Sequence, residues 1–255
     1  MSFSFYGELC TEVYDLTKKV GQSINGDLEY YYSRLKQTEG KILEVMAGSG
    51  RVTIPLLEKG LNIEGTDYSS QMLASCRNRL AERGLHANLY EADLQKLSLP
   101  HKYAAIIIPA GSFLLIEDRE QSLQALKRLY DHLLPGGRLI LDLFLPDNQF
   151  EAGQTSPIST YHMPDGDMIT MESTLVETSF FHQYKVSYLK YEKWREGALI
   201  QTELQRFALR WYGVEEFKLL LEHIGFQDIV ISADFEYGKT PDSNSECFVY
   251  EAVKP

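Results

Sequence analysis

The strongest constraint on the fold is an alternation of short apolar runs with helical patterns over residues 41–144. Strand-like runs separated by helical segments are typical of βαβ units and of a parallel sheet. The runs at 104–108 and 139–144 are almost continuously apolar, as strands covered by helices on both faces are. The chain is therefore predicted to be an α/β protein. The expected strands are 41–46, 61–67, 87–93, 103–109 and 137–144.

Helices are expected between these strands and ahead of them. The stretch 69–84 opens on a serine that can cap a helix and closes on Gly84, and the stretch 119–137 ends on Pro-Gly-Gly. Two further helical patterns, at 12–19 and 27–37, precede the first strand. These boundaries predict helices before and between the strands.

The pattern changes after residue 150, where polar and apolar residues alternate over long runs joined by Asp-Gly and Arg-Glu-Gly turns. This alternation predicts an antiparallel sheet of about three or four strands. A helical period returns at Gly213, followed by two more strands. We expect a Rossmann-like, doubly wound sheet of seven strands with an inserted antiparallel sheet. The predicted divisions are a core at 1–150, an insertion at 151–212 and the C-terminal part of the core at 213–255.

The composition argues against several classes of partner. A net charge of −11 and a pI near 5.1 leave no basic footprint for nucleic acid or an anionic membrane. The three cysteines are far apart and the histidines isolated, so neither disulfides nor a metal is expected. The most apolar stretch, 104–116, is shorter than the roughly 20 residues that span a bilayer. We therefore expect a soluble, cytoplasmic protein.

The turn after the first strand is the main candidate site. Glu44 ends the strand, and Gly48 and Gly50 follow it. The glycines could simply permit a tight strand-to-helix turn. A dinucleotide site requires a third glycine where this chain has Thr53, and a P-loop requires a lysine after Gly50. A carboxylate beside the turn would repel a pyrophosphate and attract an ammonium group, so the ligand is predicted to be nucleoside-like without being a phosphate.

The segment from Glu44 to Gly50, with the acidic Asp67 ending the second strand, resembles the first motif of class I S-adenosylmethionine-dependent methyltransferases. The likeness extends along most of the core. The further matches are the segment around Asp67, the segment around Asp93, the fourth strand with Pro109, and the turn at 133–141 into the fifth strand. One departure is Met46, which stands where the family usually has glycine, and an altered pocket floor is expected there.

The resemblance implies a role for each matching residue. Asp67 would accept hydrogen bonds from both ribose hydroxyls, and Asp93 one from the adenine amino group. Glu44 and the backbone of the turn would hold the methionine moiety, and residues 109–113 would face the sulfonium. Asp67 could instead cap the next helix, Asp93 could be a turn residue, and Met72 could belong to the core. The implied cofactor-binding residues are Glu44, Ala47, Gly48, Gly50, Asp67, Tyr68, Met72, Asp93, Leu94 and Pro109.

The implied reaction is methyl transfer from S-adenosylmethionine to a nitrogen or oxygen of a small molecule. The tetrad [DN]PP[FY], which enzymes that methylate bases carry after the fourth strand, is absent. The insertion resembles the auxiliary sheet of small-molecule methyltransferases, including those acting on amino sugars and glycine-like amines. No catalytic residue is assigned, and the groups expected to reach the acceptor are Tyr6, Tyr14, Arg210, Trp211 and Tyr212.

Three alternatives stay open from the sequence. A non-catalytic protein could retain the cofactor pocket for regulation. A nucleotide-dependent oxidoreductase is another reading, which the missing third glycine opposes. The aromatic strands of the insertion could also form a homodimer interface, with or without a role at the acceptor site.

Overall fold

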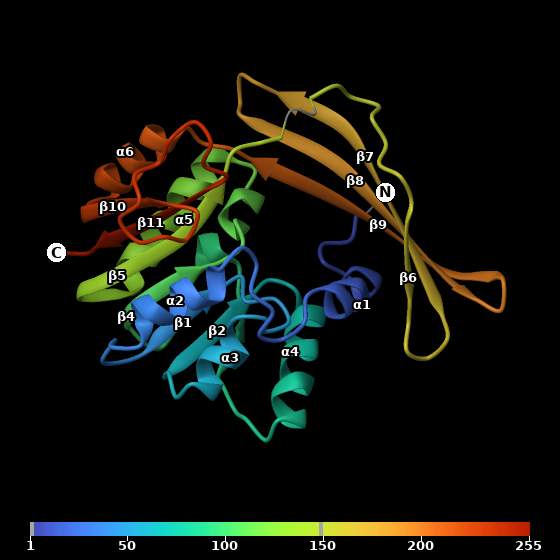
Figure 1. Cartoon of the computed structure of the whole chain (residues 1–255), viewed down its shortest axis with the longest axis horizontal. Coiled ribbons are helices and arrows are strands. Elements are labelled where there is room, and N and C mark those ends of the chain that lie inside the picture. The colour runs from blue at the N-terminus through green and yellow to red at the C-terminus, as the bar shows by residue number, and fades with distance from the viewer. Residues whose placement is uncertain (1–2, 148–149) are drawn as a thin grey trace.

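The computed structural model describes residues 3–147 and 150–255. Its main sheet has seven strands in the order β10-β11-β5-β4-β1-β2-β3 (Figure 1). Neighbouring strands are parallel except at β11, which runs antiparallel to both β5 and β10. The α/β expectation and the seven strands are confirmed. The strands are β1 (Ile42–Val45), β2 (Ile63–Asp67), β3 (Leu89–Glu91), β4 (Tyr103–Ile108), β5 (Leu133–Phe144), β10 (Gln227–Ala233) and β11 (Cys247–Val253).

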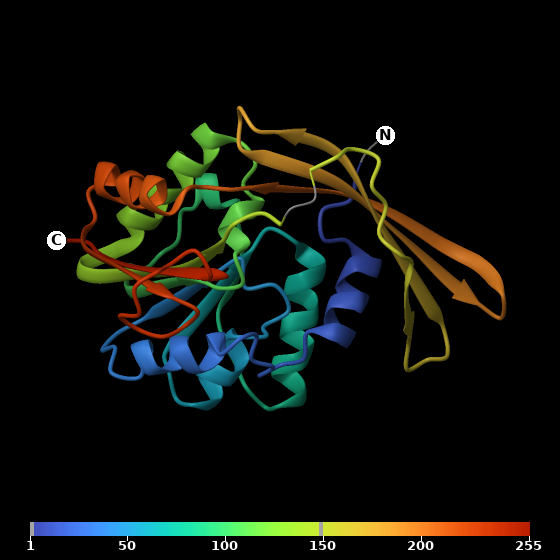
Figure 2. The same cartoon turned by 45° about the horizontal axis from the view of Figure 1, so that its top comes forward.

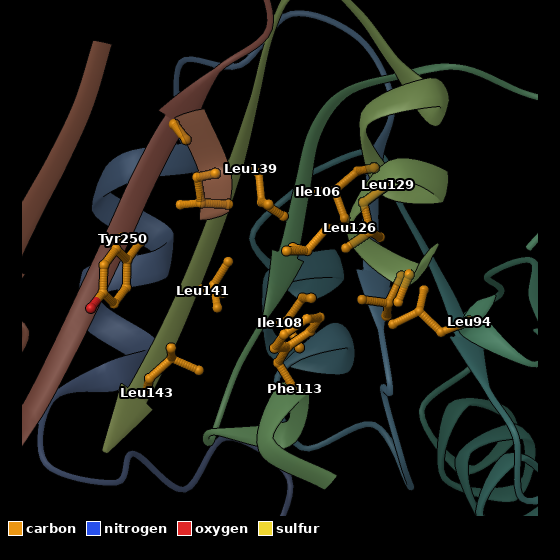
Figure 3. Close-up of a cluster of buried hydrophobic side chains, with 14 of the residues drawn as sticks. Leu94, Ile106, Ile108, Phe113, Leu126, Leu129, Leu139, Leu141, Leu143 and Tyr250 are labelled. Atoms are coloured by element: carbon orange, nitrogen blue, oxygen red, sulfur yellow. The ribbon is translucent and has the colours of Figure 1, made fainter. Parts of the chain in front are cut away.

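Helices cover both faces of this sheet, as the apolar runs predict. On β4, Ala105 and Ile107 pack with α2 (Asp27–Leu35) and α3 (Thr53–Glu58). Ile106 and Ile108 point to the other face, where Figure 3 shows them beside Leu126 and Leu129 of α5 (Arg119–His132). Helix α6 (Val214–Ile224) packs on that second face as well. Successive residues of β4 are thus buried on opposite sides, which explains the continuous apolar run.

One helix boundary was predicted wrongly. Helix α5 ends at His132, and the following Leu-Leu-Pro-Gly-Gly belongs to β5, where Leu133 pairs with Tyr103 of β4. Pro135 disfavours the helical conformation for Leu134, so the chain becomes extended earlier than the glycines suggest. Helix α4 (Ser70–Glu82) begins as expected, because the Ser69 side chain accepts a hydrogen bond from the backbone N–H of Met72.

The insertion forms a second, separate sheet of four antiparallel strands. Helix α1 (Glu8–Thr17) packs on this sheet (Figure 2). Its Leu9 and Cys10 belong to one buried cluster with Ile169 and Tyr191 of the sheet. The sheet thus lies over the core and the N-terminal helix lies beneath it. Within the two described ranges, no helix has the length and apolarity that crossing a membrane requires. The strands are β6 (Ser159–His162), β7 (Met168–Ser179), β8 (Tyr184–Arg195) and β9 (Ala198–Arg210).

Candidate functional site

A cavity of about 1020 Å³ opens at the carboxyl edge of the main sheet. It lies where the strand order reverses between β1 and β4, which is the usual ligand position in open α/β sheets. Strand β9 of the inserted sheet lines it from the opposite side. Eight of the predicted site residues line this cavity: Tyr6, Tyr14, Gly48, Asp67, Tyr68, Met72, Asp93 and Leu94.

Asp67 organises the glycine turn. Its Oδ2 accepts a hydrogen bond from the backbone N–H of Gly48 at 2.8 Å, and its Oδ1 accepts one from Ser69 at 2.8 Å. Burial raises the pKa of the Asp67 carboxyl, and backbone N–H groups oppose that rise. A carboxylate has about four acceptor sites, so Asp67 keeps capacity for hydroxyl donors. The helix cap is Ser69, so the reading of Asp67 as the side-chain cap of α4 does not hold.

Asp93 and Leu94 lie at the end of β3 on the same cavity wall as Asp67. The Asp93 side chain accepts a hydrogen bond from Gln95 N at 3.0 Å and caps a short 3-10 helix, Leu94–Lys96. This capping is the turn role that was the alternative for Asp93, and the residue also faces the cavity. Met72 lines the cavity although it is almost fully buried, so its packing role and its site role coincide.

Glu44 lies beneath the turn and outside the cavity lining. Its carboxylate accepts a hydrogen bond from the Thr53 hydroxyl. Burial raises the pKa of Glu44 to about 7, while Thr53 and the nearby Arg51 guanidinium lower it. Thr53, which replaces the third glycine of a dinucleotide site, therefore holds the buried acid. A direct contact from Glu44 to a methionine moiety stays a prediction.

Several predicted residues near the turn and on β4 also lie outside the cavity lining. Gly50 has a φ of +87°, and a Cβ there would come 2.7 Å from Cys76 Sγ of α4, so this glycine permits close packing of the helix. Ala47 is buried, and its backbone N–H bonds to Thr66. Pro109 precedes the turn at Ala110, which does reach the cavity.

Met46 forms part of the cavity floor in a strained conformation. Its φ is +57°, in the left-handed region that favours glycine. The structure therefore explains why a glycine would suit this position. The Met46 side chain packs against the main apolar cluster and lines the cavity, so the floor carries a thioether that glycine would lack.

Asp142 is a cavity residue that sequence reasoning missed. It lies near the end of β5 and accepts hydrogen bonds from Tyr31 Oη at 2.6 Å, Ala110 N at 3.0 Å and Gly111 N at 2.7 Å. Burial raises the pKa of Asp142 to about 6, against these donors. The signal was available, because a carboxylate inside the apolar run Leu-Ile-Leu-Asp-Leu-Phe requires buried partners.

The N-terminal segment crosses between the inserted sheet and the side of the cavity that carries Tyr68 and Ser69. Ser4 N donates to Leu204 O of β9 at 2.9 Å, and the Tyr6 carbonyl accepts from the Ser69 hydroxyl at 2.7 Å. Between these anchors, the Phe5 ring meets the Tyr68 ring edge-on, with centroids 5.3 Å apart. We call residues 3–7 the strap, and its residues 3–6 line the cavity together with β9.

The three residues predicted to reach the acceptor from the end of β9 and just after it lie outside the cavity lining. Tyr212 is buried, and its hydroxyl bonds to Ser122 of α5. Arg210 donates to the carbonyl of Glu117, and Trp211 packs against Phe180. The part of β9 that does line the cavity is 205–209. There the Arg206 guanidinium makes a bidentate ion pair with the Glu117 carboxylate.

Comparisons with known proteins agree with this geometry. Residues 42–137 match the methyltransferase domain family. The chain is a class I S-adenosylmethionine-dependent methyltransferase. The match begins at β1 and ends in the turn before the apolar part of β5, so it contains the glycine turn, Asp67 and Asp93.

The methyltransferase is 27% identical to the glycine/sarcosine N-methyltransferase of Halorhodospira halochloris over 229 residues, 89% of this chain and 80% of that protein. Its fold is similar to that of the sugar N-methyltransferase KedS8 from Streptoalloteichus, with a TM-score of 0.73, 19% identity, and 100% and 97% of the two chains covered. It is also similar to an S-adenosylmethionine-dependent methyltransferase from Clostridium acetobutylicum, with a TM-score of 0.72, 18% identity, and 94% and 96% covered.

The cofactor of this methyltransferase is S-adenosylmethionine, and the donor set of the cavity fits it. Asp67 offers carboxylate acceptors for two neighbouring hydroxyls, and Asp93 offers one for an amino group. Tyr68, Met72 and Leu94 supply apolar surface around these acids. The assignment of each contact to a part of the cofactor remains a prediction.

Proposed function

We propose that this enzyme methylates an amine nitrogen of a small molecule, and that the acceptor lies between the Ala110–Gly111 turn and β9. The observation that carries this proposal is the charge of the cavity lining. It has more acids than bases: the acids are Asp27, Asp67, Asp93, Glu117, Asp142 and Glu246, and the bases are Lys18, Lys96 and Arg206. An excess of carboxylates favours cations, and both a sulfonium and a protonated amine are cations.

Asp142 is the carboxylate that we assign to the acceptor's ammonium group. Tyr31 and two backbone N–H groups occupy about three of its four acceptor sites, and one remains on the side of Gly111. Its pKa of about 6 places it among bases that are ionised at neutral pH and can still take a proton. An ammonium must lose a proton before its nitrogen can react, and Asp142 is proposed to receive it.

The chain's remaining contribution is position and exclusion of water. When bound, S-adenosylmethionine supplies the methyl group, which the acceptor's nitrogen lone pair takes while sulfur keeps the electron pair of the broken S–C bond. Residues 3–6 of the strap and strand β9 line the cavity, and we propose that they shield the reacting groups from water. Orientation of two bound reactants alone accounts for much of the rate in such a displacement.

Two relatives support an amine over a hydroxyl. The Halorhodospira relative is named for glycine and sarcosine, and KedS8 is named for a sugar nitrogen. We also propose that the acceptor is a small molecule and not a nucleic acid, because a net charge of −11 would repel a phosphate backbone. We further propose a cytoplasmic enzyme, since all three cysteines are free thiols. A homodimer through the inserted sheet stays a proposal that gel filtration with light scattering would test.

The test of the function is transfer of labelled methyl groups from S-adenosylmethionine to a panel of 2-aminoethanol, glycine, glucosamine, simple phenols and carboxylates. Methylated amines are expected, and Asp142→Asn should lower kcat/KM for them at least tenfold. Its dissociation constant for S-adenosylhomocysteine should stay within about threefold, a difference under 1 kcal/mol. Methylation of phenols or carboxylates with no amine product would refute the proposal.

A further inference from the structure

A second cavity of about 620 Å³ lies on the face of the inserted sheet that also carries Phe207 and Leu209. These two β9 side chains line both cavities, so the two spaces adjoin across them. Pockets of ~300–1,000 Å³ are the usual size for a small ligand. The first cavity alone is at the top of this range, and the second adds a separate volume beside it.

The lining of the second cavity comes from one face of three neighbouring strands. Ser187 of β8 is paired with Phe207 of β9, and Leu175 of β7 is paired with Ser187. Residues two apart on a strand share a face, so Ser173 and Leu189 lie on this face as well. Gln154, Thr155, Ser156 and Pro157 close one side of the cavity.

The polar groups of this lining are neutral or mutually neutralised. Its charged side chains are Lys185 and Asp147, and they form an ion pair of 2.6 Å. The hydroxyls of Ser173 and Ser187 are half-buried and have no hydrogen-bond partner within residues 3–147 and 150–255. Each hydroxyl can both donate and accept. Open hydroxyls beside the apolar side chains of Leu189 and Phe207 suit a ligand that has hydroxyl groups and C–H faces.

The contrast with the first cavity is chemical. The first cavity is rich in carboxylates and favours a cation, whereas the second offers no net charge and several hydroxyls. We propose that the second cavity binds an uncharged, hydroxyl-bearing part of the methyl acceptor, such as a sugar ring, while the acceptor's amine lies in the first cavity. This inference rests on the proposed function, because it assigns the amine to the first cavity.

The test compares two probes by calorimetry in the presence of saturating S-adenosylhomocysteine. One probe is glucosamine, and the other is glucosamine linked β-1,4 to N-acetylglucosamine, whose second ring is uncharged. The disaccharide is expected to bind at least tenfold more tightly to the wild-type protein. Ser187→Phe, which fills the second cavity, should remove this gain and leave the dissociation constants of glucosamine and S-adenosylhomocysteine within threefold.

Two further variants separate the site from a folding effect. Ser173→Leu intrudes on the same cavity from β7 and should also remove the gain. Thr202→Phe introduces the same side chain as Ser187→Phe at an exposed position on the opposite face of the sheet, and should keep the gain. Each variant's melting temperature shows whether it is folded.

The inference is overturned if the disaccharide binds no more tightly than glucosamine, if neither probe binds, or if Ser187→Phe weakens both probes equally. Its failure differs from failure of the proposed function. If amines of the panel are methylated but the second ring gives no gain, only the second cavity is misassigned. If the cofactor binds and no amine is methylated, the amine assignment itself is wrong.

Discussion

Replacing Asp67 by alanine should weaken cofactor binding far more than it destabilises the fold. Two hydroxyl donors to a carboxylate contribute about 1.5–3 kcal/mol each. Allowing for partial non-additivity, the loss corresponds to roughly tenfold to several-hundredfold in the dissociation constant. The bonds from Gly48 N and Ser69 N are lost as well, but the cost of burying the Asp67 carboxylate is also removed, so the free energy of unfolding should fall by only about 1 kcal/mol.

Ligand-induced stabilisation separates these two effects. At a concentration one hundred times the wild-type dissociation constant, S-adenosylhomocysteine should stabilise the wild-type protein by about 2.7 kcal/mol. With a hundredfold weaker site, the same concentration should stabilise Asp67→Ala by only about 0.4 kcal/mol. Denaturant unfolding with and without the ligand measures both quantities.

Asp118→Ala is the matched control. Asp118 caps α5 by accepting a hydrogen bond from Gln121 N at 2.8 Å, and it lies outside the cavity lining. Its loss should cost about 1 kcal/mol of stability and leave the ligand effect intact. If Asp67→Ala instead lowers stability and keeps an affinity within threefold of wild type, Asp67 serves the turn alone and the ribose assignment is wrong.

Three further predictions concern the floor beneath the turn, the Met46 backbone and the strap. Burial raises the pKa of Glu44 in the folded protein from 4.5 to about 7, so between these pH values the folded protein holds a proton that the unfolded chain has released. As the pH rises from 4.5 to 7, the free energy of unfolding of wild type should therefore fall by ~3 kcal/mol relative to that of Glu44→Gln. Urea unfolding measures this difference, and a difference that does not vary with pH would contradict the prediction. Met46→Gly should be more stable than Met46→Ala by up to ~1 kcal/mol, because φ is +57° there, and the reverse order would refute the strain argument. Glu203 accepts hydrogen bonds from Ser4 Oγ at 3.1 Å and Leu9 N at 2.9 Å, and so helps to hold the strap in place. Glu203→Ala should speed the release of S-adenosylhomocysteine, measured by stopped flow, by about fivefold for each kcal/mol of strap stability that is lost. An unchanged rate would mean that the strap does not gate release.

The core fold could be predicted because its signals are local. Alternating burial on β4 forces the run of apolar residues at 104–108, and the change to period-two patterning marks the inserted sheet. The end of α5 was misplaced because a Pro-Gly-Gly turn usually ends a helix directly. Here the pairing of Leu133 with Tyr103 extends β5 back to the helix.

The cofactor side of the site could be predicted for a similar reason. Gly48, Asp67 and Asp93 lie at the ends of three neighbouring parallel strands. Because these ends meet at one edge of the sheet, the sequence predicts that the three residues lie close together. The acceptor side depends on how the inserted sheet docks. Five consecutive residues of β9, 205–209, line the cavity although adjacent side chains face opposite ways, and the sequence alone does not show where along the strand this lining ends.

Asp142 depends on contacts that are distant in sequence. Its partner Tyr31 lies in α2, 111 positions away, and its other partners belong to the turn at Ala110 and Gly111. A buried acid in the sequence implies that it has hydrogen-bond partners, but it does not identify them. The Ala110–Gly111 turn in turn needs left-handed backbone, with φ of +60° and +63°, so the acid and the turn support each other.

The most direct test of the central claim is a crystal structure with S-adenosylhomocysteine bound. The ribose is predicted to lie on the Asp67 carboxylate and the adenine beside Asp93 and Leu94. The sulfur should then face the space between Asp142 and β9, where the acceptor amine is proposed to lie. Product bound outside this cavity, or a sulfur directed away from Asp142 and β9, would contradict the account.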